Sequence, residues 1–327
     1  MKTNIPIFTT MLTLTSLISL TSTNSFFVWT MLELNMLSFI PLLSTSNSTP
    51  ETEASIKYII PQAFASSLFM TSTILMNLTP NFNILTTLAL IMKLGGAPLH
   101  TWFPAVMQST NLPASLILTT WQKLAPLLLM TTKELSFTPA ITLSAITSAM
   151  WGSMAGLNQT NLLKLMAFSS INHLGWLMMA SLFNPLTAGL YLLLYSLTVF
   201  PIFIILNYLN TKSYNMTILK FQTTQQWLTI ILMMLSLAGL PPMPMFMMKL
   251  QVITLMISKP MLIQLTIMLL GTTISLYFYL SLTISLMLNQ ITSLTTPTTT
   301  KSPNSLLHTT LLILQLTATP IFLMSIP

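Results

Sequence analysis

The sequence contains no cysteine, no arginine and no aspartate, and only 5% of its 327 residues are charged. Without cysteine the chain can form no disulfide, perform no thiol chemistry and hold no Fe–S cluster through thiolates. Soluble domains carry about 25% charged residues, so this chain has too little polar surface to remain monomeric in water. The composition therefore excludes an ordinary soluble protein.

The sequence also has few residues suited to a metal, haem or nucleic-acid site. The three histidines, His100, His173 and His308, are well separated in the chain, which argues against a haem or zinc site. The net charge of +7 comes from single, scattered lysines, and these make no basic face for a nucleic acid.

Hydrophobic residues make up 53% of the chain, and they occur in repeated runs of about 20, the length that crosses a bilayer as a helix. The strand-like alternation of a membrane β-barrel is absent. We therefore expect an all-α polytopic membrane protein, a single membrane domain over residues 1–327 with about eleven transmembrane helices. The expected spans are approximately 5–21, 26–43, 57–78, 82–104, 112–131, 138–157, 165–183, 186–209, 225–257, 261–288 and 305–326.

Two of these spans contain glycine and proline together. The fourth has Gly96-x-Pro98-x₄-Phe103, and the ninth has Gly239-x-Pro241-x₄-Phe246. In the ninth span, Pro242 directly follows Pro241. Helices broken inside a membrane must line a wet or protein-packed cavity, and matching breaks in two halves point to a transport path. We therefore expect both helices to be broken.

The five-helix interval between the breaks predicts an internal repeat, and an odd number of crossings inverts the second copy. We expect a first inverted repeat at about 1–133, a second at about 134–290 and an appended C-terminal helix at about 304–327. More lysines fall on the N-terminal side than opposite, so the positive-inside rule places the N-terminus in the matrix or cytoplasm. The lysines on the N-terminal side are Lys2, Lys57, Lys164, Lys212, Lys220 and Lys301, against Lys133 and Lys259.

Four charged residues fall near the middle of expected spans: Glu33, Lys93, Lys123 and Lys249. A charge at the bilayer centre costs about 2.5–3.5 kcal/mol on insertion scales, and such residues usually mark ion or proton pathways. Snorkelling to the surface is a poor alternative for Lys123, which lies roughly 16 Å inside its span. A structural salt bridge is the alternative for Glu33. Contact between Glu33 and Lys93 would form a switch that loads or releases a proton on the lysine.

Histidines and edge charges are less informative. His173 has polar neighbours in Ser169-Ser170-Ile171-Asn172 and is a candidate for a water chain, with a packing role as the alternative. His100 lies beside the first break. Glu51, Glu53 and Lys57 form an expected cluster at the membrane edge.

Several segments spread across nearly the whole chain resemble the antiporter-like membrane subunits of respiratory complex I, in the form that animal mitochondria encode. These segments are Met31-Leu32-Glu33-Leu34-Asn35, Met92 to Pro104, Thr120-Trp121-Gln122-Lys123-Leu124-Ala125-Pro126, Asn158-Gln159-Thr160, Ser169 to Trp176, and Leu237 to Pro242 with Phe246 and Lys249 after it.

The resemblance implies a role in proton translocation across the mitochondrial inner membrane. It implies that Glu33 pairs with Lys93, that Lys123 is the next proton carrier and that Lys249 is the last. The partners it implies are other membrane-arm subunits of complex I, with lipid, water and protons. Flavin, Fe–S clusters, quinone and NADH would be bound by other subunits, with no redox chemistry, cofactor or metal in this chain. It also implies that three N-terminal helices of longer relatives are missing.

Two other functions remain open at this point. One is a subunit of a cation/proton antiporter, which would share the motifs and the buried lysines. The other is a purely structural membrane subunit whose charges hold helices together.

Overall fold

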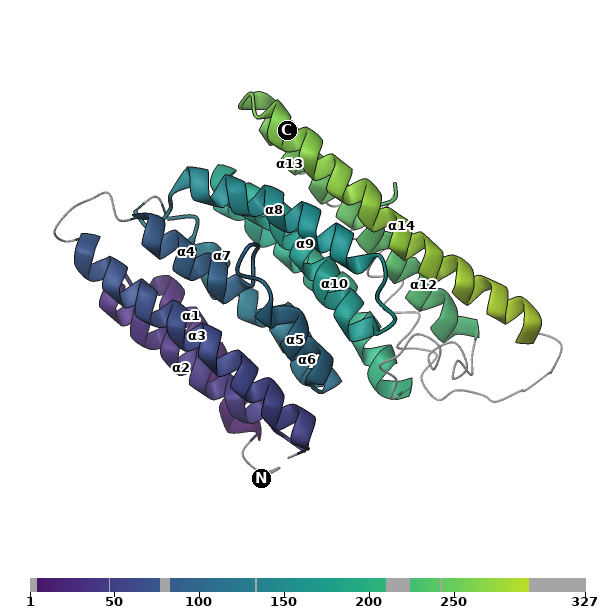
Figure 1. Cartoon of the computed structure of the whole chain (residues 1–327), viewed down its shortest axis with the longest axis horizontal. Coiled ribbons are helices and arrows are strands. Elements are labelled where there is room, and N and C mark those ends of the chain that lie inside the picture. Colours follow the sequence, from purple (N-terminus) through teal and green to yellow (C-terminus); the bar gives the residue numbers. More distant parts are fainter. Residues whose placement is uncertain are drawn as a thin grey trace.

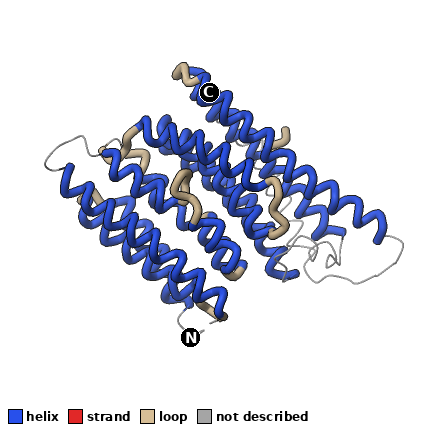
Figure 2. Tube along the Cα trace, in the orientation of Figure 1, coloured by secondary structure: helices blue, strands red, loops and turns tan. Residues whose placement is uncertain are grey.

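The computed structural model describes residues 5–46, 48–76, 83–132, 134–209, 224–241 and 243–293. Every regular element in these ranges is a helix, which confirms the predicted all-α class (Figure 2). The helices are α1 (Ile5–Thr21), α2 (Ser25–Leu43), α3 (Thr49–Met76), α4 (Asn83–Leu94), α5 (Trp102–Ser109), α6 (Leu112–Thr119), the 3₁₀ turn η3 (Trp121–Lys123), α7 (Leu124–Leu129), α8 (Thr138–Gly156), α9 (Leu162–Phe183), α10 (Pro185–Leu209), α12 (Thr224–Ala238), α13 (Pro244–Ser258) and α14 (Leu262–Ser293).

The sequence colours run from purple at one end to yellow at the other, so the chain advances along the long axis of the molecule (Figure 1), although α14 returns to pack on α8. Helices α1, α2 and α3 form one end and pack on each other, and α12, α13 and α14 lie towards the other end. Helix α9 is central: 18 of its 22 residues are buried, because α5, α7, α8, α10, α13 and α14 all contact it. A polar side chain on α9 therefore faces protein on every side.

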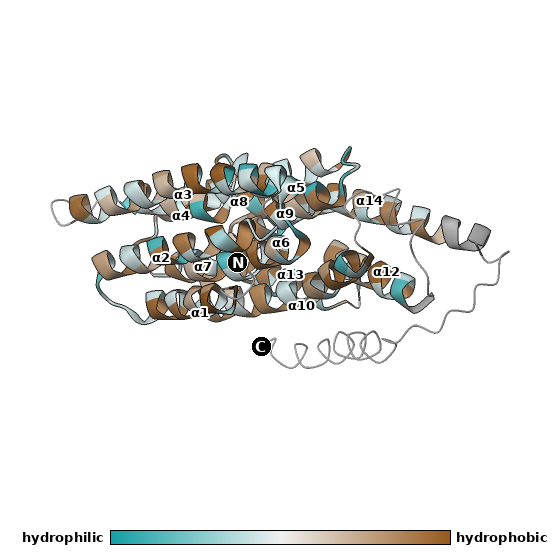
Figure 3. Cartoon of the chain, turned by 90° about the horizontal axis from the view of Figure 1, so that it is seen from below, coloured by the Kyte–Doolittle hydropathy of each residue, from teal (hydrophilic) through white to brown (hydrophobic). Residues whose placement is uncertain are grey.

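The outside of the bundle is largely apolar. Large hydrophobic side chains such as Ile60, Leu143, Leu186 and Ile263 are more than half exposed, and brown hydrophobic residues cover most of the helices in Figure 3. Such a surface suits hydrocarbon and not water. Within the described residues, four helices are long and apolar enough to cross a membrane: Ser25–Leu43, Thr49–Met76, Pro185–Leu209 and Leu262–Leu288. The predicted helix at about 304–327 lies outside the described residues.

Three glycines let helices α8, α9 and α14 meet at backbone distance. A Cβ atom on Gly175 would lie 2.6 Å from the Ala145 carbonyl oxygen, and one on Gly152 would lie 2.6 Å from the Asn172 nitrogen. On α14, a Cβ atom on Gly271 would lie 2.8 Å from the Ala149 oxygen. Close approach over small residues is the usual way in which membrane helices gain dispersion contacts. Helix α9 is thus held tightly against α8.

The first break ends α4 with a glycine cap. Gly95 has φ of 74°, and the Gly95 and Gly96 amides donate to the Met92 and Ile91 carbonyls at 3.1 and 2.9 Å. This is the hydrogen-bond pattern of a Schellman motif, which requires a left-handed residue best supplied by glycine. The chain then passes through the exposed Pro98 before α5 begins at Trp102.

The second break repeats this cap. Gly239 has φ of 81°, and the Gly239 and Leu240 amides donate to the Ser236 and Leu235 carbonyls at 3.0 and 3.4 Å. The structurally equivalent residues are therefore Gly95 and Gly239, so the Gly-x-Pro match is shifted by one residue at the cap. Pro241 lies in the turn that follows, and Pro242 lies outside the described residues.

The expected span at about 112–131 is not one helix, and here the prediction was wrong. Helix α6 ends at Thr119, and a 3₁₀ turn over Trp121–Lys123 precedes α7. Pro126 explains the interruption, because proline has no amide hydrogen and its ring clashes with the carbonyl four residues earlier, that of Gln122. Lys123 therefore lies at an irregular point of the backbone.

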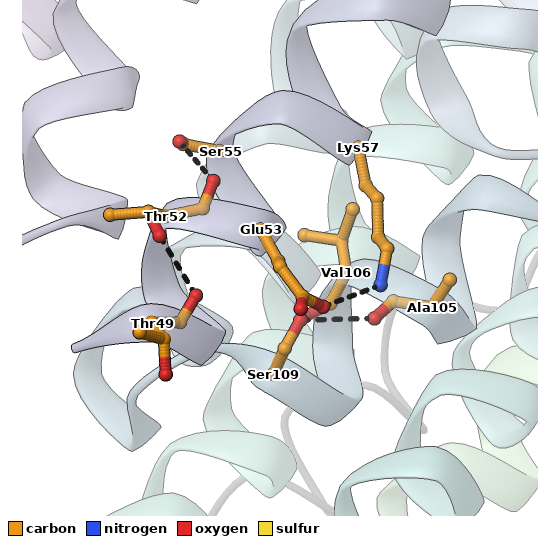
Figure 4. A network of polar contacts seen from close by, with 8 residues as sticks. All are labelled: Thr49, Thr52, Glu53, Ser55, Lys57, Ala105, Val106 and Ser109. Atoms are coloured by element: carbon orange, nitrogen blue, oxygen red, sulfur yellow. Dashed lines mark hydrogen bonds and ion pairs between the residues drawn. The ribbon is translucent and has the colours of Figure 1, made fainter.

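The edge cluster extends α3 towards the N-terminus, to Thr49 in place of the predicted residue 57. Glu51 is buried and accepts hydrogen bonds from the Ser46 amide and hydroxyl. Glu53 and Lys57 form an exposed ion pair of 3.1 Å, one helical turn apart. Figure 4 shows this pair beside Ser109 of α5. These charged side chains make their contacts at the start of α3 and lie apart from the breaks.

Candidate functional site

Lys93 lies in the last turn of α4, where the unpaired carbonyls of a half-helix favour a positive charge. Its side chain is buried. Its own backbone carbonyl accepts from the Gln62 amide at 3.2 Å, and the Met92 carbonyl accepts from the Trp102 indole at 3.1 Å. Neutral side chains thus cap the helix end, and the Lys93 ammonium is not used for that purpose.

A small cavity of about 20 Å³ lies between Lys93 and Lys123. One water needs roughly 10–15 Å³ of such space and two to four polar partners. The cavity has both, because polar side chains from four helices line it. These polar residues are Asn35, Tyr58, Gln62, Lys93, Gln122 and Lys123.

Glu33 lies on α2 and accepts a hydrogen bond of 2.6 Å from the Ser66 hydroxyl through Oε1. Its Oε2 is buried without a hydrogen-bond partner. Within the described ranges only Lys57 and Glu53 form an ion pair within 4.0 Å. Glu33 and Lys93 therefore form no direct ion pair, which leaves one bridging water as the expected link between them.

Lys123 is 2% exposed and points into the protein. Its Nζ donates to the Ser170 carbonyl of α9 at 3.1 Å. The ammonium also lies 5.4 Å from the centre of the Phe103 ring and 5.2 Å from that of Tyr195. These contacts join α5, the 3₁₀ turn, α9 and α10 at one point.

His173 lies in the middle of α9, a helix that contacts α5 of the first break and α13 of the second. Its Nδ1 is 3.0 Å from the Tyr191 hydroxyl. Its Nε2 is buried without a partner of good hydrogen-bond geometry, and its ring centre lies 5.2 Å from that of Tyr195. The ring therefore packs against a side chain that also contacts Lys123.

Lys249 follows the second break in sequence but returns to it in space. Its buried Nζ donates to the Ala238 carbonyl, the last residue of α12, at 3.3 Å. A Cβ atom on Gly239 would lie 2.9 Å from this nitrogen. The ammonium thus lies at the C-terminal end of the first half-helix, as Lys93 does in the other break.

His100 is buried beside the first break, and its Nδ1 lies 3.2 Å from the Pro98 carbonyl. Its ring packs edge-on against Trp151 at 5.9 Å. No contact with Glu33 or the three buried lysines is observed for it among the described residues, so it is not brought into the same cluster.

Sequence reasoning did not single out several polar side chains of this region. Tyr191 and Gln62 come from helices distant in sequence, and only the fold brings them close to the buried site, whereas Gln122 directly precedes Lys123 in the chain. Three further buried atoms on α9 have no hydrogen-bond partner: Asn172 Oδ1, His173 Nε2 and Trp176 Nε1. Buried groups of this kind are usually satisfied by water.

Comparison with known proteins identifies the family and the fold of the chain. Residues 76–275 match the family model described as NADH:quinone oxidoreductase/Mrp antiporter, transmembrane. Among solved structures, respiratory complex I from Thermus thermophilus has a chain that superposes with a TM-score of 0.78 at 24% identity, covering 86% of this chain and 70% of that one. An archaeal membrane-bound sulfane sulfur reductase gives a TM-score of 0.76 at 17% identity, with coverage of 91% and 69%. The chain therefore has the antiporter-like membrane fold.

Curated relatives narrow the assignment. NADH-ubiquinone oxidoreductase chain 2 from Lumbricus terrestris is 39% identical over 287 residues, which cover 84% of each chain. The corresponding protein from Anopheles gambiae is 41% identical over 296 residues, which cover 86% of each. The chain belongs to the NADH-ubiquinone oxidoreductase chain 2 family, which confirms the resemblance found in its motifs.

Proposed function

We propose that this chain is a membrane-arm subunit of the respiratory NADH:ubiquinone oxidoreductase and relays protons across the mitochondrial inner membrane. The observation that carries the proposal is the series of buried titratable groups along one helix. Lys123 donates to the Ser170 carbonyl on α9, His173 follows one turn later, and α13, which carries the buried Lys249, contacts the same helix. Buried lysines are expensive in a membrane unless they serve such a path.

In this proposal a proton moves between Lys93 and Lys123 through the cavity between them. It then passes His173 and reaches Lys249 at the second break. Each lysine would pass its proton to the next group of the path. Water at the unpaired polar atoms of α9 would complete the chain.

The remaining parts of the proposal concern the whole chain. It would have about eleven transmembrane helices in two inverted repeats and a C-terminal helix, with the N-terminus on the matrix side. Its partners would be other subunits of the complex, which would also hold the flavin, Fe–S clusters and quinone. The matching Schellman caps at Gly95 and Gly239 support the repeat.

Lys123→Met tests this function in the assembled oxidoreductase reconstituted in vesicles. We expect NADH oxidation to continue while fewer protons are moved per electron. The control is Lys259→Met, which removes an exposed lysine and leaves the ratio unchanged. An intact Lys123→Met complex with the normal ratio would exclude the relay, and failure to assemble together with an unaffected control would favour a structural role.

A further inference from the structure

Lys123 is enclosed by aromatic rings that the lysine relay alone does not require. Phe103 comes from α5 and Tyr195 from α10, and their ring centres lie 5.4 and 5.2 Å from Nζ. Both distances are within the roughly 6 Å at which an ammonium is attracted by the face of an aromatic ring. The Ser170 carbonyl accepts from the same nitrogen at 3.1 Å. Two rings and one carbonyl thus surround the ammonium.

The tyrosine contributes its ring and not its hydroxyl. The Tyr195 hydroxyl is buried and has no hydrogen-bond partner of good geometry, although it lies beside Ser170. The same ring packs against His173, with centres 5.2 Å apart. Tyr195 therefore stands between Lys123 and the next group of the path.

The phenylalanine belongs to the broken helix. A Cβ atom on Gly95 would lie only 3.1 Å from the Phe103 Cβ, so the left-handed glycine of the cap makes room for this side chain. Phe103 is also the last residue of the motif Gly96-x-Pro98-x₄-Phe103. The position of the ring is thus tied to the geometry of the break.

We propose that Phe103 and Tyr195 form an aromatic cage, which holds the protonated Lys123 side chain against the Ser170 carbonyl. The two aromatic residues are positioning residues for Lys123, and the proposal rests on the relay function given above. Cation–π attraction is strongest where the ammonium is buried, so each ring should change the population of the docked ammonium roughly 5- to 30-fold. Movement of α5 at the break would remove one wall and free the side chain to turn away.

Substitution of each ring in the assembled complex tests the cage, with protons moved per NADH oxidised as the measurement. We expect Phe103→Leu and Tyr195→Leu each to lower this ratio, while NADH oxidation continues. Tyr195→Phe keeps the ring face and should restore the ratio lost in Tyr195→Leu. The packing control is Phe203→Leu, at a buried ring on the same helix α10, and it should keep the ratio.

Lys123→Met separates the cage from the relay. If the cage acts through Lys123, adding Tyr195→Leu to Lys123→Met should lower the ratio no further. Normal pumping by the assembled leucine variants, loss of pumping in Tyr195→Phe, or an equal loss in Phe203→Leu would each overturn the cage. Normal pumping by Lys123→Met would instead overturn the relay function itself, and impaired pumping there with normal leucine variants would overturn only the cage.

Discussion

The two broken helices satisfy the backbone carbonyls at their C-terminal ends with different side chains. At the first break, the neutral amide of Gln62 and indole of Trp102 cap the carbonyls at the end of α4, and Lys93 is left to face the cavity. At the second break, the Lys249 ammonium itself caps the end of α12. In the proposed relay, cap and proton carrier would be separate residues in one half of the molecule and a single residue in the other. Proton release from Lys249 would then weaken a helix cap, whereas release from Lys93 would not.

Lys249→Met should have the largest effect, because it removes the carrier and the cap together. We expect the assembled complex to oxidise NADH and to lose most of the proton movement that depends on this chain. Proton uptake per NADH in reconstituted vesicles is the measurement, with Lys259→Met as the exposed control at the end of the same helix. An unchanged ratio in Lys249→Met would remove the second break from the path.

Gly239→Ala should have the second-largest effect on proton movement. A left-handed backbone costs a non-glycine residue about 1–3 kcal/mol, and the new Cβ atom would lie 2.9 Å from the Lys249 nitrogen. We expect lower thermal stability of the complex and a reduced proton ratio. Gly189→Ala is the matched control, since a Cβ atom there meets nothing within 4 Å. Equal behaviour of the two variants would contradict the role of the cap.

Glu33→Gln should affect proton transfer only in the first half of the molecule, and less strongly than the two preceding substitutions. The carboxylate lies beyond ion-pair distance of Lys93, so its attraction is below about 4 kcal/mol, the value for unit charges 4 Å apart at an effective dielectric of 20. We expect a partial fall in protons moved per electron. Glu53→Gln, at the exposed edge pair, should show none. A full proton ratio in Glu33→Gln would mean that Lys93 needs no acidic partner.

Gln62→Leu should chiefly change stability and have the smallest effect on proton movement, because five other polar residues still line the cavity between Lys93 and Lys123. It removes the donor to the Lys93 carbonyl, a loss of about 1 kcal/mol for a typical hydrogen bond. Thermal denaturation of the complex should detect it, while the proton ratio falls only slightly. A fall as large as that in Glu33→Gln would show that cap and carrier are linked in the first half as well.

Much of the fold followed from local sequence. The expected spans at about 26–43, 138–157 and 186–209 agree with α2, α8 and α10 to within about one residue. Both breaks were found because glycine and proline disrupt helices for local reasons. The interruption before Lys123 was missed, although Pro126 was a visible signal for it.

The site was less accessible to sequence reasoning. Glu33, Lys93, Lys123 and Lys249 stood out because charges in apolar runs are rare. Their partners did not, since Ser170, Tyr195 and Gln62 are ordinary residues that only the packing of distant helices brings to the lysines. The return of Lys249 to Ala238 also depends on the path of the chain after the break, and no spacing rule predicts it.

The burial of α9 has a consequence for how the chain is made. While a helix first enters the membrane, its polar groups face hydrocarbon until neighbouring helices arrive. Asn172 and His173 are not fully covered until α10, α13 and α14, all later in the chain, have been inserted. Gly175 must also pack against α8. We therefore expect an intermediate during synthesis in which the polar side chains of α9 are not yet covered. Quality-control proteases of the membrane would meet it there, and variants that slow the closure of α9 should lower the amount of complex before they alter its chemistry.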